Sequence, residues 1–197
     1  MIALRPKAKR PGPLSREAWV RAATVLIAQE GVAAVAVEPL AQALWVTKGS
    51  FYWHFKTRDE LIQVTLEAWE QDQSADVVTR YAAIPEPRQR LRVLLFAAFE
   101  DVMNGRFFAA LSVSSEDPRV RPFLRRATER RLAFGVEAFR ALGLDEKEAR
   151  QRALLAYAAY AGYFQLLRTS PEAVAAVTDL SGYVRRLADA LVPPRLH

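Results

Sequence analysis

The spacing of apolar residues along the chain is the feature that most constrains its fold. Between Ser15 and Gly31 these residues fall three and four positions apart, the repeat of one face of an α-helix. The same spacing returns after residue 57 and after the Pro85-Glu86-Pro87 segment, whereas no stretch of useful length alternates as a strand does. The predicted fold class is therefore all-α, with about nine helices at roughly 15–30, 38–44, 48–55, 58–80, 87–104, 106–115, 118–142, 146–168 and 171–191.

Capping signals predict where several of these helices begin. Thr57 suits an N-cap, and Glu60 three residues later completes a capping box. Further starts are predicted at Ser15, at Asp145 with Glu148, and at the Asp-Pro and Ser-Pro pairs that begin at Asp117 and Ser170.

The segment from Ala153 to Leu167 is apolar in almost every direction around a helix. A helix without a polar face is expected to be buried on all sides. The following segment, 171–191, carries its apolar residues on one stripe instead. This pair predicts a homodimer whose interface is formed by 146–168 and 171–191 of each chain. A helix buried centrally in a monomer is the alternative.

Composition narrows the class of protein. The chain has 197 residues, enough for one or two ordinary domains, and no cysteine, which excludes a disulfide scaffold and any thiolate site. Hydrophobic residues make up 51% and charged residues 25%, the balance of a chain that folds around a core.

The net charge of +6 is concentrated at the start of the chain. Residues 1–16 contain no acidic side chain, and their basic ones are Arg5, Lys7, Lys9, Arg10 and Arg16. Such an arm suits a polyanion, either nucleic acid or an anionic membrane surface, and a solvated tail is the alternative. No apolar leader follows the arm, and 153–167 is too short to span a bilayer, so a soluble cytoplasmic protein is expected.

Residues 38–56 hold the densest functional signal. They are typical of two short helices joined by about three residues, as in a helix-turn-helix. That spacing is common to many helical hairpins. The composition is more specific, because no acid falls between Thr47 and Lys56, where lysine, serine, tyrosine and histidine supply hydrogen-bond donors.

This segment resembles the DNA-binding signature of the tetracycline-repressor (TetR) family over about residues 15–62. The resemblance is carried by Leu40-Ala41, by Val46-Thr47-Lys48-Gly49-Ser50-Phe51-Tyr52-Trp53-His54-Phe55-Lys56 and by Arg58-Asp59-Glu60-Leu61. Two positions depart from the family pattern. Trp45 lies in the turn where the family usually has glycine, and a turn residue with positive φ suits glycine and strains tryptophan. Ala36-Val37 lacks the usual Thr or Ser cap of the second helix.

The resemblance implies a DNA-binding site made of Thr47, Lys48, Gly49, Ser50, Tyr52, Trp53, His54 and Lys56. Thr47 would cap the recognition helix and donate its hydroxyl to a phosphate, and Lys48 and Lys56 would bind phosphates. Gly49 would let the backbone come close, and Ser50 would lie near base edges.

The other aromatic positions of the segment have different implied roles. Tyr52 and His54 are the family's usual contacts to the DNA backbone, whereas Phe51 and Phe55 belong to the core of the domain. Trp53 either packs on thymine methyls or sugars or has a structural role. A histidine metal site is not expected, because the only other histidine in the chain is His197.

The resemblance also divides the chain into a basic arm (1–14), a helix-turn-helix DNA-binding domain (15–57) and an effector-binding and dimerisation domain (58–197). It implies a ligand-responsive repressor that binds a palindromic operator as a homodimer and is released by a small molecule. Many aromatic residues with few charges nearby predict an apolar or aromatic effector. The candidate lining residues are Trp69, Phe96, Phe99, Met103, Phe107, Phe108, Phe134, Tyr157, Tyr160 and Phe164.

Other classes of function find less support. The sequence has no glycine-rich phosphate loop, no nucleophile elbow and no paired-histidine spacing, so no enzyme, cofactor or metal is expected. Two alternatives remain open at this stage: a small-molecule carrier or helical enzyme, which would not bind DNA, and an architectural DNA-binding protein, which would ignore ligands.

Overall fold

The computed structural model of the chain describes residues 14–177 and 179–192, without the side chains of 72–80, 82 and 177. The arm residues Arg5, Lys7, Lys9 and Arg10 lie outside the described residues. Over this range the elements are α1 (Arg16–Glu30), a short 3-10 helix η1 (Val32–Ala34), α2 (Val37–Ala43), α3 (Lys48–Tyr52), α4 (Arg58–Ala82), α5 (Pro87–Glu100), α6 (Val102–Val113), α7 (Arg121–Arg140), α8 (Glu146–Thr169), α9 (Pro171–Val177) and α10 (Leu180–Leu191). The all-α prediction is confirmed.

Three of the predicted boundaries are wrong. The break predicted between 87–104 and 106–115 lies at Asp101, whose carboxylate accepts a hydrogen bond from the N–H of Asn104 and caps α6. The segment 171–191, predicted as one helix, forms two, α9 and α10, and Asp179 accepts a hydrogen bond from the N–H of Gly182 to begin the second. The helix predicted from 118 begins at Arg121 instead. Asp117 does not cap it, because its carboxylate binds the backbone N–H and the guanidinium of Arg119 within the preceding turn.

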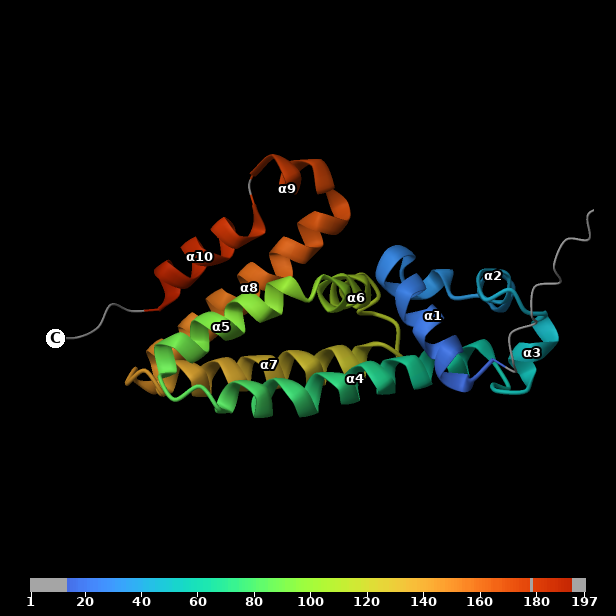
Figure 1. Cartoon of the computed structure of the whole chain (residues 1–197), viewed down its shortest axis with the longest axis horizontal. Coiled ribbons are helices and arrows are strands. Elements are labelled where there is room, and N and C mark those ends of the chain that lie inside the picture. The colour runs from blue at the N-terminus through green and yellow to red at the C-terminus, as the bar shows by residue number, and fades with distance from the viewer. Residues whose placement is uncertain (1–13, 178, 193–197) are drawn as a thin grey trace, which may run out of the picture.

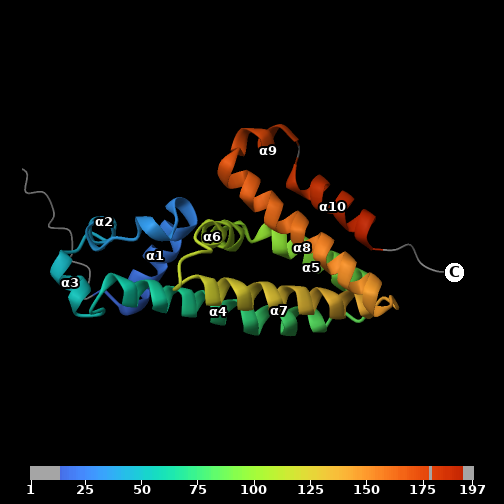
Figure 2. The same cartoon turned by 180° about the vertical axis from the view of Figure 1, so that it is seen from behind.

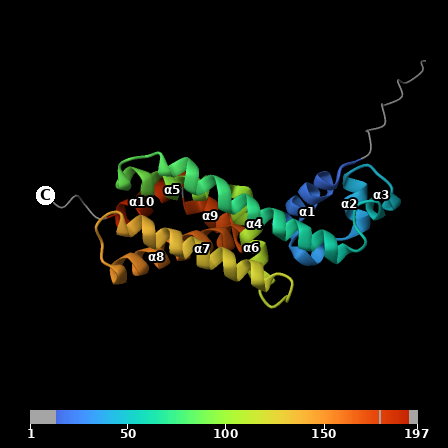
Figure 3. The same ribbon diagram turned by 90° about the horizontal axis from the view of Figure 1, so that it is seen from below.

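The molecule is elongated, with α1, α2 and α3 gathered at one end (Figure 1). We call these helices the three-helix end. Helix α4 starts there and runs alongside α7, as the views from behind and from below also show (Figures 2 and 3). Helices α5 to α10 form the body, in which α7 packs on α8, and α10 packs on α5 and α8. The body also contacts the three-helix end directly, because α6 packs against α1.

Helix α8 has two faces of different character, although its sequence is apolar nearly all round. Ala153, Tyr160 and Phe164 are buried in the body. Leu154 and Leu155 are each more than half exposed. The expectation that this helix is buried on all sides is therefore not met within a single chain. Its exposed apolar stripe follows helical spacing and consists of Leu154, Leu155, Ala158, Gly162 and Leu166.

The contact between α6 and α8 is closest at Gly105. A Cβ atom added to Gly105 would lie 2.2 Å from Cζ of Phe164, whose side chain is fully buried. The phenyl ring of Phe164 therefore occupies the space that any larger side chain at position 105 would need. Glycine at this position is required by packing rather than by backbone conformation.

We expect Gly105→Ala to lower the free energy of unfolding by about 1–3 kcal/mol, because the added methyl group overpacks a core with no room for it. Chemical denaturation measures the loss. Adding Phe164→Leu to Gly105→Ala should cost less than the two single losses together, since the smaller side chain relieves the clash. Simple additivity in this cycle would contradict the proposed contact.

An ion-pair cluster joins α4 to α7 halfway along the body. The carboxylate of Glu70 accepts hydrogen bonds from Nε and Nη2 of Arg126, both at 2.7 Å, and from Nη1 of Arg130 at 2.8 Å. The hydrogen bonds from Arg126, together with those from Arg130, lower the pKa of Glu70 to about 2. The carboxylate is therefore more stable as an anion in the folded chain than in the unfolded one.

Glu70→Gln should lower the free energy of unfolding at pH 7 by about 1–2 kcal/mol, since both arginines are partly exposed. The folded pKa lies below the ordinary value of 4.5, so the contribution is complete above that value and disappears as the pH falls towards 2. Denaturation of both proteins at pH 7, 4.5, 3 and 2 should show the difference shrinking with acidity.

Glu129→Gln is the matched control for this test. Glu129 lies on α7, where its carboxylate is 3.7 Å from Nη1 of Arg125 and its side chain is well exposed. An exposed pair of this kind is expected to contribute less than about 0.5 kcal/mol. Equal effects of the two substitutions would show that the Glu70 cluster has no special role.

Candidate nucleic-acid interface and ligand pocket

The turn between α2 and α3 has a defined hydrogen-bonded geometry. The N–H of Val46 donates to the carbonyl of Ala41 (3.0 Å), and the N–H of Trp45 donates to the carbonyl of Gln42 (3.1 Å). These two bonds are those of a Schellman motif, which places Trp45 at the position where the backbone turns left-handed. Trp45 accordingly has φ 57°, the only positive φ outside glycine in the part of the chain that the structure describes. Trp45 therefore takes the left-handed backbone that the family's usual glycine would adopt without a steric penalty.

Aromatic packing holds α3 in place. Phe51 is fully buried, with its ring 5.4 Å from that of Trp19 on α1 in an edge contact and 5.5 Å from that of Phe55 in a stacked one. The guanidinium of Arg16 covers the Phe55 ring at 4.8 Å. As predicted, Phe51 and Phe55 belong to the core of the three-helix end.

The eight residues predicted to bind DNA lie together on α3 and directly before and after it, in the three-helix end (Figure 1). Most are exposed, and Ser50 and His54 are half-buried. The prediction that Thr47 caps α3 through its side chain is not met. Thr47 has the extended backbone of an N-cap, but the N–H of Ser50 donates to its backbone carbonyl at 2.9 Å, and its hydroxyl makes no capping bond.

Gly49 has open surroundings. A Cβ atom there would meet only Oγ1 of Thr47, at an ordinary contact distance of 3.7 Å. Packing within the chain therefore does not require glycine at this position, in contrast to Gly105. The small side chain leaves the backbone of α3 accessible from outside.

The charge around this segment is one-sided. No acidic residue falls between Pro39 and Arg58. The two acids that follow are engaged in ion pairs: Asp59 with Arg119 of the turn before α7, and Glu60 with Arg16 at 3.1 Å. Within the segment 39–58 itself, all the charged side chains are therefore positive.

Arg58 is a positioning residue that the sequence analysis did not single out. Its guanidinium donates to the carbonyls of Val35, of Val32 at 3.1 Å and of Ala33 at 3.2 Å. A guanidinium carries five donors, so one side chain can collect a whole turn of backbone acceptors. The connection between α1 and α2 is thereby fixed to the first turn of α4. An arginine at a helix start, after a short connection between helices, was the available sequence signal.

The ten residues predicted to line an effector pocket mostly pack on one another in the body. Trp69 lies against Phe107 with ring centroids 5.3 Å apart, and Phe164 lies against Tyr160 at 5.0 Å. Trp69, Phe99, Phe107, Phe108, Tyr160 and Phe164 are buried, Phe96, Phe134 and Tyr157 are half-buried, and Met103 is exposed. Their role as a lining remains a prediction.

A charged side chain that the sequence analysis missed lies among these rings. The guanidinium of Arg131 stands over Phe108 at 4.7 Å, over Tyr160 at 5.2 Å and over Trp69 at 5.7 Å. It also donates to Oδ1 of Asn104, which accepts a bond from Nε1 of Trp69 at 2.9 Å. The aromatic set is therefore not purely apolar.

The tyrosine hydroxyls of this region are held in their neutral form. Burial raises the pKa of Tyr157 and of Tyr160. The hydroxyl of Tyr157 shares a hydrogen bond of 2.8 Å with Oγ1 of Thr128. That of Tyr160 is buried and has no hydrogen-bond partner among the described residues. Both groups remain protonated around neutral pH and can donate to an acceptor.

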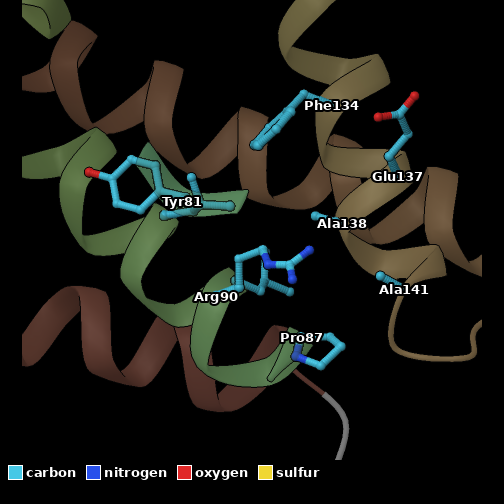
Figure 4. A pocket seen from close by; sticks show the side chains of 9 residues that line it. Tyr81, Pro87, Arg90, Phe134, Glu137, Ala138 and Ala141 are labelled. Carbon is cyan, nitrogen blue, oxygen red and sulfur yellow. The ribbon is translucent and has the colours of Figure 1, made fainter. Parts of the chain in front are cut away.

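A separate cavity of about 180 Å³ opens between α4, α5 and α7 (Figure 4). Its lining residues are Tyr81, Pro87, Arg90, Leu91, Leu94, Phe134, Glu137, Ala138 and Ala141. Phe134 alone belongs to the predicted effector set. The cavity is smaller than the roughly 300–1,000 Å³ of typical ligand pockets, so it has room for a small molecule only.

Neither a metal site nor a membrane-spanning helix is present in the described ranges. Within 14–177 and 179–192, no three acidic, histidine or cysteine residues are grouped so that they could hold a metal ion. Among the helices of those ranges, none has the length and apolar character needed to cross a bilayer.

Comparisons with known proteins place these features in a family. Residues 20–65 match the family model of bacterial regulatory proteins, tetR family. The HTH-type transcriptional regulator AcrR of Shigella flexneri is 31% identical over 102 residues, which are 50% of this chain and 46% of that protein. The match thus spans about half the length of this curated relative.

Solved structures resemble the chain over almost its whole length. A TetR transcriptional regulator from Legionella pneumophila has a TM-score of 0.74 at 16% identity, covering 91% of this chain and 98% of that one. A putative transcriptional regulator from Saccharomonospora viridis, solved in complex with choline, has a TM-score of 0.71 at 17% identity. The match covers 89% of this chain and 92% of that one. At such identities the likeness concerns the fold. The matched helix-turn-helix segment, the AcrR relative and these neighbours in fold together support a TetR-family regulator.

Proposed function

We propose that the protein is a DNA-binding transcriptional regulator that represses its target as a homodimer and is released from a palindromic operator by a small molecule. The observation that carries the proposal is the exposed, acid-free segment around α3 at the tip of the molecule. Positive side chains on an accessible backbone are what the phosphates of DNA require. Family membership supports the same function.

The proposed contacts follow from the exposure of the segment. Lys48 and Lys56 bind phosphates, with Tyr52 contacting the backbone beside them. Ser50, half-buried in the first turns of α3, faces base edges, and Gly49 lets the helix come close to the groove. The domain division at residue 57 belongs to the proposal as well, with α4 leading from the DNA-binding domain into the body.

The homodimer is supported by the exposed apolar stripe of α8. Leu154, Leu155 and Leu166 are each more than half exposed, and Ala158 and Gly162 between them would allow close helix approach. Helix α10 offers less apolar surface for a dimer interface than its sequence predicted, because Val184, Ala188 and Leu191 are already buried in the body. We therefore assign the main part of the interface to α8. The two recognition helices of such a dimer would enter major grooves about 34–36 Å apart, or a multiple of that distance.

The effector is proposed to bind among the aromatic residues of the body. Arg131 affects which chemistry suits this region, because its guanidinium already covers the faces of Phe108 and Tyr160. A quaternary ammonium such as the choline bound by the Saccharomonospora viridis protein would have to compete with that cation. A neutral or acidic aromatic effector fits better. The hydroxyl of Tyr160 offers it a hydrogen-bond donor.

Lys48→Ala should weaken binding to every duplex and lower the slope of log affinity against log salt by about one, because one phosphate contact and its released counterion are lost. Fluorescence anisotropy between 50 and 200 mM salt measures both, using a labelled duplex from the DNA upstream of the protein's own gene. Lys147→Ala, an exposed lysine at the start of α8, is the control and should leave the slope unchanged. An unchanged slope in Lys48→Ala would reject the phosphate contact.

Leu155→Glu should dissociate the dimer, since it buries a carboxylate without a partner in the proposed apolar interface. Sedimentation velocity at micromolar concentration would then show a folded monomer, with helical content preserved in circular dichroism. Val113→Glu, an equally exposed apolar position on α6, should stay dimeric. If Leu155→Glu sediments as a dimer, α8 is not the interface.

A further inference from the structure

Trp45 and Trp53 are the most exposed large apolar side chains of the described chain, at 90% and 89%. Both belong to the helix-turn-helix segment. Trp53 follows α3, within the set already predicted to meet DNA, whereas Trp45 lies before α3 and has no assigned role. An indole left in water loses the burial that usually stabilises it, so its presence at a surface commonly marks a contact with another molecule.

The backbone of Trp45 carries a second cost. With φ 57° it adopts the left-handed conformation that glycine takes without a steric penalty and that a bulky side chain takes with strain. The turn does not need the indole. Its two bonds are made by the backbone N–H groups of Trp45 and Val46. At 90% exposure the side chain packs on almost nothing among the residues that the structure describes. Strain without an internal benefit is typical of a functional position.

The surroundings indicate what covers this indole. Thr47 and Lys48, two and three residues further on, are exposed and belong to the proposed DNA surface. No acid lies between Pro39 and Arg58, so the patch complements a polyanion. The exposed stripe of α8 lies in the body, away from α2 and α3, so the dimer interface does not reach this turn (Figure 1). The neighbouring occupant is therefore the DNA duplex.

We propose that Trp45 binds the sugar–phosphate backbone at the edge of the groove that receives α3. The ring face covers a deoxyribose, and the indole N–H donates to a phosphate oxygen. This inference rests on the proposed DNA-binding function and adds to it a contact that the family's usual glycine cannot make. Because sugar and phosphate are the same in every sequence, the contact strengthens binding without selecting bases.

Trp45→Gly separates this role from a structural one. The variant should bind about 5- to 10-fold more weakly, because truncating an aromatic at the edge of an interface costs less than truncating one at its centre. The loss should be equal for the upstream duplex and for a scrambled duplex of the same length. The salt slope should match that of the wild type, because an uncharged side chain releases no counterion, whereas Lys48→Ala lowers it. The thermal unfolding midpoint should stay the same or rise, because glycine suits the turn.

Three further variants serve as controls. Trp45→Asn, which also tolerates the left-handed backbone, should show the same loss as Trp45→Gly if removal of the indole is the cause. Trp45→Phe keeps a ring without the N–H and should bind with intermediate affinity. Val113→Ala truncates an exposed apolar side chain outside the segment and should bind as the wild type does.

Three results would overturn the inference. Wild-type affinity of Trp45→Gly for both duplexes would show that the indole touches no DNA, and the proposed function would stand if Lys48→Ala were still impaired. A fall of more than a few degrees in the unfolding midpoint of both Trp45→Gly and Trp45→Asn would show a structural role. A changed oligomeric state in the absence of DNA would show a protein contact instead. If the wild type itself showed no salt-dependent binding to any duplex, the proposed function would fail first.

Discussion

The 25-residue helix α4 is the constraint on which the rest of the structure depends, because both ends of the molecule are fixed to it. At its start, Arg58 collects three backbone carbonyls from the connection between α1 and α2. Further along, Glu70 holds two arginines of α7. A continuous helix transmits rotation and translation from one set of contacts to the other. Any rearrangement of the body around an effector must therefore either move the three-helix end or break one of these clusters.

Two other contacts connect the body to the three-helix end. Helix α6 packs against α1, and the guanidinium of Arg168 at the end of α8 donates to the carbonyl of Gln29 at the end of α1. Helix α6 also packs against α8 through Gly105 and Phe164. The proposed effector-binding residues on α4, α6 and α8 thus lie on helices that touch α1 directly. Ligand binding needs to favour one arrangement of these contacts by only about 1–3 kcal/mol to change DNA affinity 5- to 150-fold.

Local signals predicted most of the helices, because a helix is specified by neighbours in sequence. The capping bond from the Glu60 N–H to Thr57 and that from the Glu148 N–H to Asp145 are both present. Predictions failed where a distant or competing partner decides. Asp117 was predicted as an N-cap from its place before a proline, but its carboxylate accepts hydrogen bonds from Arg119 instead. The place of Arg131 among three aromatic rings depends on α4, α6 and α8 coming together around α7, which no local pattern encodes.

The sequence allows the candidate DNA site to be predicted in more detail than the effector region, for a physical reason. An interface with phosphates needs exposed donors and an absence of acids, and both are visible as composition in a short segment. Its one strained position was visible too, because a Schellman turn demands a left-handed residue and Trp45 stands where glycine would satisfy it. The strain is tolerated because the Phe51 and Phe55 core and the Arg58 bonds fix the segment on both sides of the turn. A local rule can be broken at a surface when the surrounding structure over-determines the conformation, and such surfaces are where binding residues are found.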